Sequence, residues 1–340
     1  MTNKRLRAAW GDKLLTDEPL AKHTTFGIGG PADFFVVAHT AAELCNYVRL
    51  ARVECVPYFI LGTGANLLVS DQGIRGLVIQ NQAGSIEFTP DPEAIPSSEM
   101  AWLGKAESGA ALSELARRAV ERGLANLEWA VDVPGTVGGA VVGNAGAFGG
   151  YVSDSLRGVS VFNGEGERWL PASQLGLTYR SSVFKKGKKA ADLPAVVLSA
   201  HFSLREQDAE ALRAKAIEYT SRRAESQPHG LSAGSVFKRT AQYPAGFLIE
   251  NAGLKGARVR GAVVSPRHAN FIVNEGTASA LDVLDLIELV RTVVYDKFKL
   301  TLELEIELVG EWQDAYCLTP RKACVRCAST LGTASGTKPG

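Results

Sequence analysis

The chain has 340 residues, of which 46% are hydrophobic and 21% charged, so it can bury ordinary cores and form two or three domains. Its 37 basic and 36 acidic side chains leave a formal charge of +1, which excludes an electrostatic footprint for nucleic acid or an anionic membrane. No long apolar run is present, and no apolar segment follows the charged start MTNKRLRAAWGDKLL. We therefore expect a cytoplasmic protein without membrane insertion, which acts on a small molecule as a monomer or weak oligomer.

The five cysteines are too few and too scattered for a disulfide scaffold. Only Cys324 and Cys327, in the order Cys-Val-Arg-Cys, have the spacing of a redox or metal site, and neither a second pair nor a histidine accompanies them. We therefore expect no metal site. The small polar residues within 313–340 are typical of a disordered tail, and we expect its cysteine pair to be functionally silent.

Strand and helix signals alternate along the chain without internal repeats. Thr40 and Glu43 have the spacing of a capping box, which predicts a helix from there to about Val53. Apolar residues at helical spacing predict another helix over 112–120, and Asn163-Gly164 marks a hairpin. Further strands are expected at 34–37, 57–61, 77–79, 100–103, 158–162, 167–170 and 195–204, and further helices at 209–223 and 280–298.

The segment 301–309, TLELEIELV, alternates apolar and acidic residues. A period of two predicts a final strand in which Glu303, Glu305 and Glu307 share one face. From the pattern alone, these glutamates are one solvated acidic stripe.

Two segments have the composition of phosphate cradles. Residues 61–66, LGTGAN, follow an expected strand, and residues 133–150 contain seven glycines but no lysine or arginine. Neither segment contains the Gly-Lys-Ser/Thr of a nucleoside-triphosphate loop, and the first lacks the third glycine of the dinucleotide fingerprint. One such loop alone is more often a plain turn. Two together fit a long ligand whose pyrophosphate is held by backbone N–H groups from two lobes, which indicates a flavin dinucleotide.

Six motifs occur together in a recognisable order between about residues 16 and 312. They are TFGIGG at 25–30, LGTGAN at 61–66, VPGTVGG with NAGA between 133 and 147, YRSSVF at 179–184, AGSVFK at 233–238 and LELE at 302–305. In this order the chain resembles the UDP-N-acetylenolpyruvoylglucosamine reductase (MurB) family. The short spacing between Arg180 and Ser235 resembles the family's shorter branch, which lacks an inserted tyrosine loop, so no tyrosine is assigned to cover the pocket.

The resemblance implies an oxidoreductase that holds FAD without a covalent link and is reduced by NADPH. It would then reduce UDP-N-acetylglucosamine enolpyruvate to UDP-N-acetylmuramate, a step in the synthesis of peptidoglycan precursors. By motif match, Arg180 is the cation beside the developing negative charge, Ser235 the proton donor and Glu305 the acidic partner. Without the resemblance, these residues would be a surface cation, a turn residue and a member of the acidic stripe.

The cofactor and substrate contacts are also expected by motif match. FAD contacts are expected at Gly62, Thr63, Gly64, Ala65, Asn66, Pro134, Gly135, Thr136, Gly138, Gly139, Asn144, Gly146 and Ala147. Candidates for the UDP-sugar are Lys238, Lys255, Arg267, His268 and Arg223, since polar residues in an apolar domain can supply counter-charge to a diphosphate. An isolated His beside an apolar strand is as often structural.

The expected fold is α+β, with a two-lobed FAD-binding fold of the vanillyl-alcohol-oxidase/PCMH type and an inserted α+β substrate-binding domain. The first lobe would span 1–82, the second 83–206 with 300–312, and the substrate domain 207–299. Two alternatives stay open at this point. One is a flavin-dependent oxidase or dehydrogenase of the same fold, and the other is an inactive nucleotide-binding regulatory module.

Overall fold

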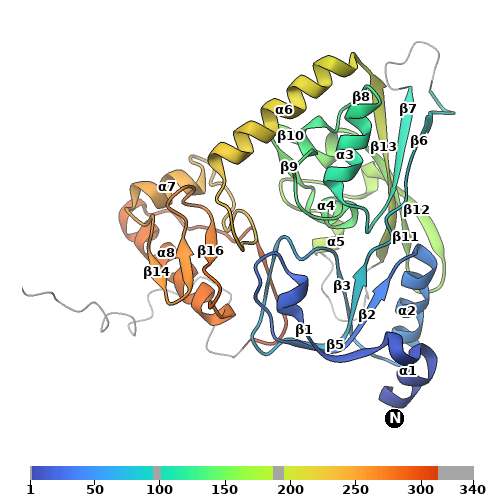
Figure 1. Ribbon diagram of the computed structural model, residues 1–340, viewed down its shortest axis with the longest axis horizontal. Helices are drawn as coiled ribbons and strands as arrows, with labels where there is room; N and C mark the ends of the chain where they lie inside the picture. Colours follow the sequence, from blue (N-terminus) through green and yellow to red (C-terminus); the bar gives the residue numbers. More distant parts are fainter. Residues whose placement is uncertain (1, 95–100, 187–194, 313–340) are drawn as a thin grey trace, which may run out of the picture.

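The computed structural model describes residues 2–94, 101–186 and 195–312, and the expected tail with Cys324 and Cys327 lies outside them. These residues form an α+β structure of three parts (Figure 1). The first part contains a mainly parallel sheet, the second an antiparallel sheet, and the third a small sheet between helices. The expected domain boundaries near residues 82 and 206 fall between elements of different parts, and they stay predictions.

The first sheet has the strand order β1-β2-β5-β3, and its last three strands run parallel. The connection from β2 to β3 passes through α2, as parallel pairing requires. The Thr40 side chain caps α2 as the capping box predicts, accepting the Glu43 N–H, but Glu43 accepts the N–H of His39 instead of Thr40. The elements are β1 (Leu15–Pro19), β2 (Pro31–Ala38), α2 (Ala41–Val53), β3 (Tyr58–Leu61) and β5 (Ile74–Asn81).

The second sheet is antiparallel, with the main strand order β12-β11-β13-β7-β6. Its hairpin between β11 and β12 turns at Asn163-Gly164, as expected. Helix α3 covers one face and buries the apolar residues that predicted it, including Leu112 and Leu115. The elements are β6 (Ile86–Pro90), β7 (Trp102–Glu107), α3 (Leu112–Glu121), β8 (Leu124–Ala125), β11 (Leu156–Phe162), β12 (Glu167–Pro171) and β13 (Val196–Glu206).

The glycine-rich run contains a short helix that the sequence analysis did not anticipate. Helix α4 (Val137–Gly143) begins after Thr136, whose side chain accepts the Gly139 N–H, and it is followed by β9 (Gly146–Ala147) and β10 (Gly150–Tyr151). Its glycines let the helix approach the turn that follows β7 closely: a Cβ added at Gly138 would lie 2.9 Å from the Ser108 Cβ. Part of the glycine content therefore serves packing within the protein.

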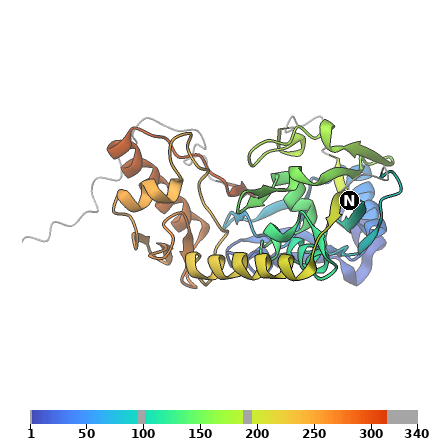
Figure 2. The ribbon, with the colours of Figure 1, turned by 90° about the horizontal axis from the view of Figure 1, so that it is seen from above.

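The third part is reached by the long helix α6 (Ala209–Ser226), which crosses from the second sheet to the third part in both ribbon views (Figures 1 and 2). Its core combines residues of α8 with Phe26, Ile28 and Leu68 from the first part, so the two parts share one apolar cluster. Helix α8 has the bounds that its periodicity predicted. The elements are α7 (Ala245–Asn251), β14 (Arg258–Val259), β15 (Ala262–Val264), β16 (Ile272–Asn274) and α8 (Ala280–Phe298).

The segment 301–309 differs from the expected strand. Only β17 (Glu307–Val309) is a strand, and it pairs in parallel with β4 (Leu67–Val69) of the first part. Upstream of β17, Leu302 and Ile306 are buried in the core of the third part. This segment thus contacts the first and third parts, while the carboxylates of Glu305 and Glu307 pair with Arg180 and Lys185 of the second part. The expected assignment of 300–312 to the second lobe stays a prediction.

The three glutamates of this segment also do not share one face. Glu303 is exposed and pairs with Lys238, Glu305 is mostly buried and pairs with Arg180, and Glu307 pairs with Lys185.

The remaining short helices are α1 (Thr2–Trp10) and α5 (Val183–Lys186).

Asp71 ties the first part to the third. Its carboxylate accepts the backbone N–H groups of Ala280 (2.8 Å) and Leu281 (3.1 Å) at the start of α8. These N–H groups have no acceptor within the helix, so an anionic side chain stabilises them well.

We expect Asp71→Ala to lower the free energy of unfolding by about 1–2 kcal/mol, because it leaves both N–H groups without a protein acceptor. Urea unfolding followed by circular dichroism measures this change. Asp296→Ala is the matched control, since Asp296 is an exposed residue near the other end of α8. Equal stability of the Asp71 variant and the control would contradict the role of Asp71.

Candidate active site

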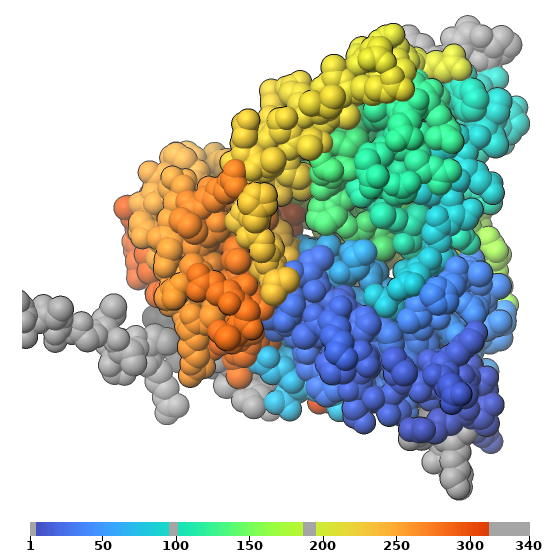
Figure 3. Space-filling model, in the orientation of Figure 1, coloured from blue at the N-terminus to red at the C-terminus, as the bar shows by residue number. Residues whose placement is uncertain are grey.

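A cavity of about 430 Å³ lies where the second and third parts meet, and the molecular surface is hollowed between these parts (Figure 3). Arg180, Ser235 and Glu305 all line it, although they come from three distant segments. The structure therefore brings together the three residues that motif matching selected.

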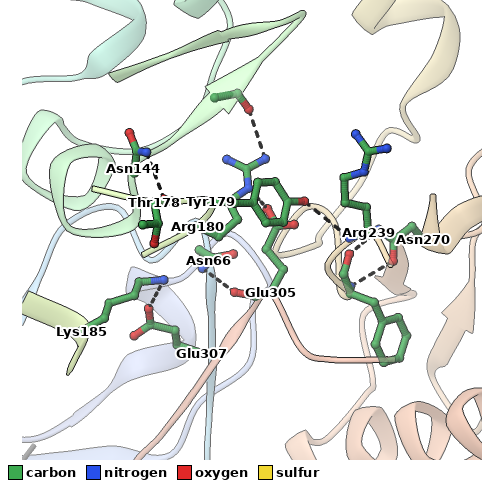
Figure 4. Close-up of polar contacts among 12 residues, drawn as sticks. Asn66, Asn144, Thr178, Tyr179, Arg180, Lys185, Arg239, Asn270, Glu305 and Glu307 are labelled. Carbon is green, nitrogen blue, oxygen red and sulfur yellow. Dashed lines mark hydrogen bonds and ion pairs between the residues drawn. The ribbon is translucent and has the colours of Figure 1, made fainter. Parts of the chain in front are cut away.

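Arg180 sits in a tight turn between Thr178 and Ser181, whose backbones form hydrogen bonds in both directions. The turn gives Arg180 a φ of +55°, which is uncommon for a residue other than glycine. Its Nε lies 2.7 Å from Oε1 of Glu305, and its Nη2 donates to the carbonyl of Gly146 at 3.1 Å (Figure 4). The guanidinium is thus fixed between the glycine-rich run and Glu305.

Glu305 is held through its backbone as well as its carboxylate. Its N–H donates to the carbonyl of Val236 at 2.8 Å, so it lies beside the segment that carries Ser235. Burial raises the pKa of the Glu305 carboxyl above its usual value, although the positive charges of Arg180, Lys185 and Lys238 act to lower it. The site therefore favours a protonated Glu305 more than water does.

Ser235 lies on an extended segment with a neighbour on each side. Ser235 forms an isolated antiparallel β-bridge with Phe271 on one side. On the other side, Phe237 of the same segment forms one with Leu304. Asn270 reinforces this arrangement, since its side chain accepts the N–H and donates to the carbonyl of Phe237. The backbone at Ser235 is thus fixed, whereas its hydroxyl has no hydrogen-bond partner among the described residues and is available to a ligand in the cavity.

The two glycine segments meet directly. A Cβ added at Gly62 would lie 2.7 Å from Oγ1 of Thr136, so the LGTGAN loop and the start of α4 touch across the two lobes. Within the described part of the chain, the backbone N–H groups of 62–66 and of Gly135 and Thr136 have no acceptor. A Cβ at Gly135, whose φ is +118°, would meet nothing within 4 Å, so the space beside Gly135 is open. Such a cradle fits a pyrophosphate.

Comparison with known proteins agrees with this geometry. Residues 32–169 match the FAD binding domain family, and residues 227–309 match the C-terminal domain of UDP-N-acetylenolpyruvoylglucosamine reductase. The chain is 41% identical over 88% of its length to the enzyme of that name from Alkaliphilus oremlandii, and 40% to that from Clostridioides difficile, covering 94% of each. The chain belongs to the UDP-N-acetylenolpyruvoylglucosamine reductase family.

A solved relative shows the same fold. The crystal structure of the reductase from Thermus caldophilus superposes with a TM-score of 0.68 at 34% identity, over 87% of this chain and 97% of that one. The resemblance read from the six motifs is thereby confirmed, as are the two-lobed α+β FAD-binding fold, FAD as cofactor and the oxidoreductase class. The alternatives of an oxidase and an inactive module are set aside. In the described ranges, no helix is long and apolar enough to cross a membrane.

Among the residues expected to contact FAD, those with free backbone N–H groups fit that role best. In contrast, Gly146 presents its carbonyl to Arg180, and the side chain of Asn144 is engaged by backbone groups of Thr178 and Ser153. The individual FAD contacts stay predictions. Gly62, Thr63, Gly64, Ala65, Asn66, Gly135 and Thr136 form the cradle described above, while Pro134 and Gly139 are exposed beside it and Ala147 lies in β9.

Two of the five residues expected to contact the UDP-sugar line the cavity. Arg267 reaches it while donating to the carbonyls of Ala224 and Glu225. Burial lowers the pKa of His268, and its Nδ1 accepts the Asn270 N–H, so the neutral ring carries its proton on Nε2.

The other three residues expected at the UDP-sugar do not line the cavity. Lys238 pairs with Glu303, Lys255 pairs with Glu250, and Arg223 packs over Phe148. Burial lowers the pKa of the Arg223 guanidinium.

Sequence reasoning missed several cavity residues. Tyr179, the neighbour of Arg180, lines the cavity, and its hydroxyl lies 3.5 Å from the backbone nitrogen of Arg239 on the facing part. The side chain of Arg239 also lines the cavity. The basic residue directly after the AGSVFK motif was the signal that could have identified Arg239, and a tyrosine preceding Arg180 was the signal for Tyr179.

We expect Gly135→Ala to weaken FAD binding at least tenfold, because the methyl group enters the open space beside Gly135, where we expect the pyrophosphate, and alanine resists the positive φ. Titration of the apoprotein with FAD, followed by flavin fluorescence, measures the affinity. Gly276→Ala is the matched control, since Gly276 also has a large positive φ (+100°) and open space around its Cβ. Both variants should lose about 1–3 kcal/mol of stability from backbone strain. Equal FAD affinity in the two would show that Gly135 is not part of the cradle.

Glu305→Gln should stabilise the free protein at neutral pH. The pKa of Glu305 is higher in the native state than in the unfolded chain. At pH values between these two pKa values, the native state therefore binds more protons than the unfolded chain. The free energy of unfolding then falls as pH rises through this range. Glutamine resembles the neutral acid and avoids this loss. The melting temperature of Glu305→Gln should therefore exceed that of the wild type at pH 7, with a smaller difference near about pH 4.

The exposed Glu303→Gln serves as control and should leave the melting temperature nearly unchanged, since a surface ion pair contributes little. A Glu305→Gln protein that is less stable than the wild type at pH 7 would contradict the raised pKa.

Proposed function

We propose that the protein reduces UDP-N-acetylglucosamine enolpyruvate to UDP-N-acetylmuramate with NADPH, through bound FAD, and that it does so in the cytoplasm. One observation carries the proposal: Arg180, Glu305 and the Ser235 hydroxyl, which has no hydrogen-bond partner among the described residues, line a single cavity. Each glycine segment bonds to the ion pair, Gly146 to Arg180 and Asn66 to Glu305. Family membership supports the same reaction.

The chemistry places separate demands on the flavin and on the protein. Bound FAD would supply the redox step, taking two electrons from NADPH and returning them as hydride to the terminal vinyl carbon of the enol ether. Hydride addition leaves negative charge on the neighbouring carbon and its carboxylate, and this carbon must then receive a proton. The side chains in the cavity have to stabilise that charge and deliver that proton.

Arg180 is suited to stabilise the negative charge that develops on the substrate. Its guanidinium is a permanent cation, held in place by Glu305 and by the Gly146 carbonyl, so little reorganisation is needed when charge develops on the substrate carboxylate. The partly buried position strengthens the attraction, because few water molecules screen it. Glu305 is the acidic partner of Arg180 in this arrangement, and burial raises the pKa of its carboxyl.

Ser235 is suited to deliver the proton to the substrate carbon. A serine hydroxyl is a weak acid, so it can protonate only a strongly basic centre such as the carbanion adjacent to the carboxylate. Its hydroxyl makes no hydrogen bond to another described residue, which leaves the proton available for transfer to carbon. After transfer, the positive charge of Arg180 in the same cavity stabilises the serine alkoxide until solvent restores its proton.

We expect Ser235→Ala to leave flavin reduction by NADPH nearly unchanged and to slow flavin reoxidation by the enol ether by about 10²–10⁴-fold. Anaerobic stopped-flow absorbance of the flavin separates the two half-reactions, with the wild type as reference and Ser226→Ala, on exposed α6, as control. Equal losses in both half-reactions would contradict the role of Ser235 as proton donor. Failure of the enol ether to reoxidise the wild-type flavin would contradict the proposed reaction itself.

A further inference from the structure

Asn66 connects the LGTGAN loop to the segment that carries Glu305. Its Nδ2 donates to the backbone carbonyl of Glu305 at 3.1 Å, and its own carbonyl accepts the N–H of Glu307 at 2.9 Å (Figure 4). These two bonds bracket Glu305 at the point where the chain enters β17. The position of the Glu305 carboxylate therefore depends on the position of the loop.

Asn144 makes an equivalent connection from the other glycine segment. It caps the end of α4 with a φ of +41°, and its Nδ2 donates to the carbonyl of Thr178 at 3.0 Å, at the base of the turn that carries Arg180. Its Oδ1 accepts the N–H of Ser153 at 3.0 Å. Asn144 is 3% exposed, so both side-chain groups are used inside the protein.

We propose that Asn66 and Asn144 are positioning residues for the Arg180–Glu305 pair, and that their side chains do not bind the flavin. The proposal rests on the proposed function, because it assigns these residues to the step in which the pair acts. Each asparagine lies in one glycine segment, and each amide group holds the backbone of one member of the pair. The cradle and the pair are thereby joined into one unit.

The hydrogen bonds of the two asparagines support this assignment. The backbone N–H of Asn144 bonds to Val141, and its side chain uses one N–H on Thr178 and its oxygen on Ser153. Because Asn144 is 3% exposed, a flavin phosphate has little access to the remaining side-chain N–H. The backbone N–H of Asn66 remains free and can still contribute to the cradle, while its side-chain N–H group points at Glu305. Replacing the Asn66 side chain would remove the link to Glu305 and leave the backbone donor in place.

Removal of the Asn66 side chain should make the Arg180–Glu305 pair less preorganised. Without the Asn66 amide, the carbonyl of Glu305 loses its bond to the loop, while the bond of Glu305 to Val236, the ion pair with Arg180 and the Glu307–Asn66 backbone bond remain. A displacement of a reacting group by about 1 Å can lower a rate by about 100-fold. The loss should appear in the half-reaction that uses the pair and not in the one that reduces the flavin.

The test uses Asn66→Ala in the full-length, FAD-loaded protein, since Asn66 is only half-buried and the variant should fold. Asn163→Ala is the matched control, because Asn163 also bonds backbone groups through its side chain, in the β11–β12 hairpin. Three quantities are measured: FAD affinity of the apoprotein, the two anaerobic half-reactions at saturating FAD, and amide hydrogen exchange of 303–309.

For Asn66→Ala we expect FAD affinity within about threefold of the wild type, unchanged reduction by NADPH, and reoxidation by the enol ether slowed about 10- to 100-fold. Amide exchange in 303–309 should be faster than in the wild type and in Asn163→Ala. Asn144→Gly, which tolerates the positive φ, should slow the same half-reaction through the Arg180 turn.

A large loss of FAD affinity, with normal reoxidation of the flavin that remains bound, would overturn the proposal and make Asn66 a flavin ligand. Unchanged reoxidation together with unchanged exchange would also overturn it. If the wild-type flavin is not reoxidised by the enol ether, the proposed function fails, but the exchange of 303–309 still decides whether Asn66 holds the Glu305 segment.

Discussion

The ion pair between Arg180 and Glu305 is the constraint on which the site depends. Both side chains are largely removed from water, and bringing two charged groups into such a place costs more than their attraction fully restores, as the raised pKa of Glu305 shows. The positive φ of Arg180 adds a local strain. The pair persists because the surrounding structure holds it, which is the arrangement expected of a site prepared for charge that appears only during reaction.

The fold places this pair by joining segments from all three parts. The turn with Arg180 belongs to the second part and rests on the end of α4 through Asn144. Glu305 lies between the third part, through Val236, and the first part, through Asn66. Because Phe26 and Leu68 of the first part also enter the core of the third, the cavity is built on shared packing and not on a flexible hinge alone.

Much of the fold could be predicted because its signals are local. Helix α8 was anticipated to its ends from apolar periodicity, and the structure shows a Ser279–Asp282 capping box at its start. The 301–309 segment was misread because its alternation comes from three separate environments, at Glu303, Glu305 and Glu307, and not from one strand face. The candidate catalytic residues were identified only by motif resemblance. The bonds that make Asn66 and Asn144 important connect distant positions, and no local pattern contains them.

The measurement that tests the central claim most directly is identification of the product formed anaerobically from NADPH and UDP-N-acetylglucosamine enolpyruvate. Mass spectrometry and proton NMR should show an enol ether that has gained two hydrogen atoms, with the vinyl signals replaced by a methyl doublet and one NADPH oxidised per product. An unchanged enol ether, with NADPH consumed only when oxygen is admitted, would contradict the account and identify the chain as a flavin oxidase.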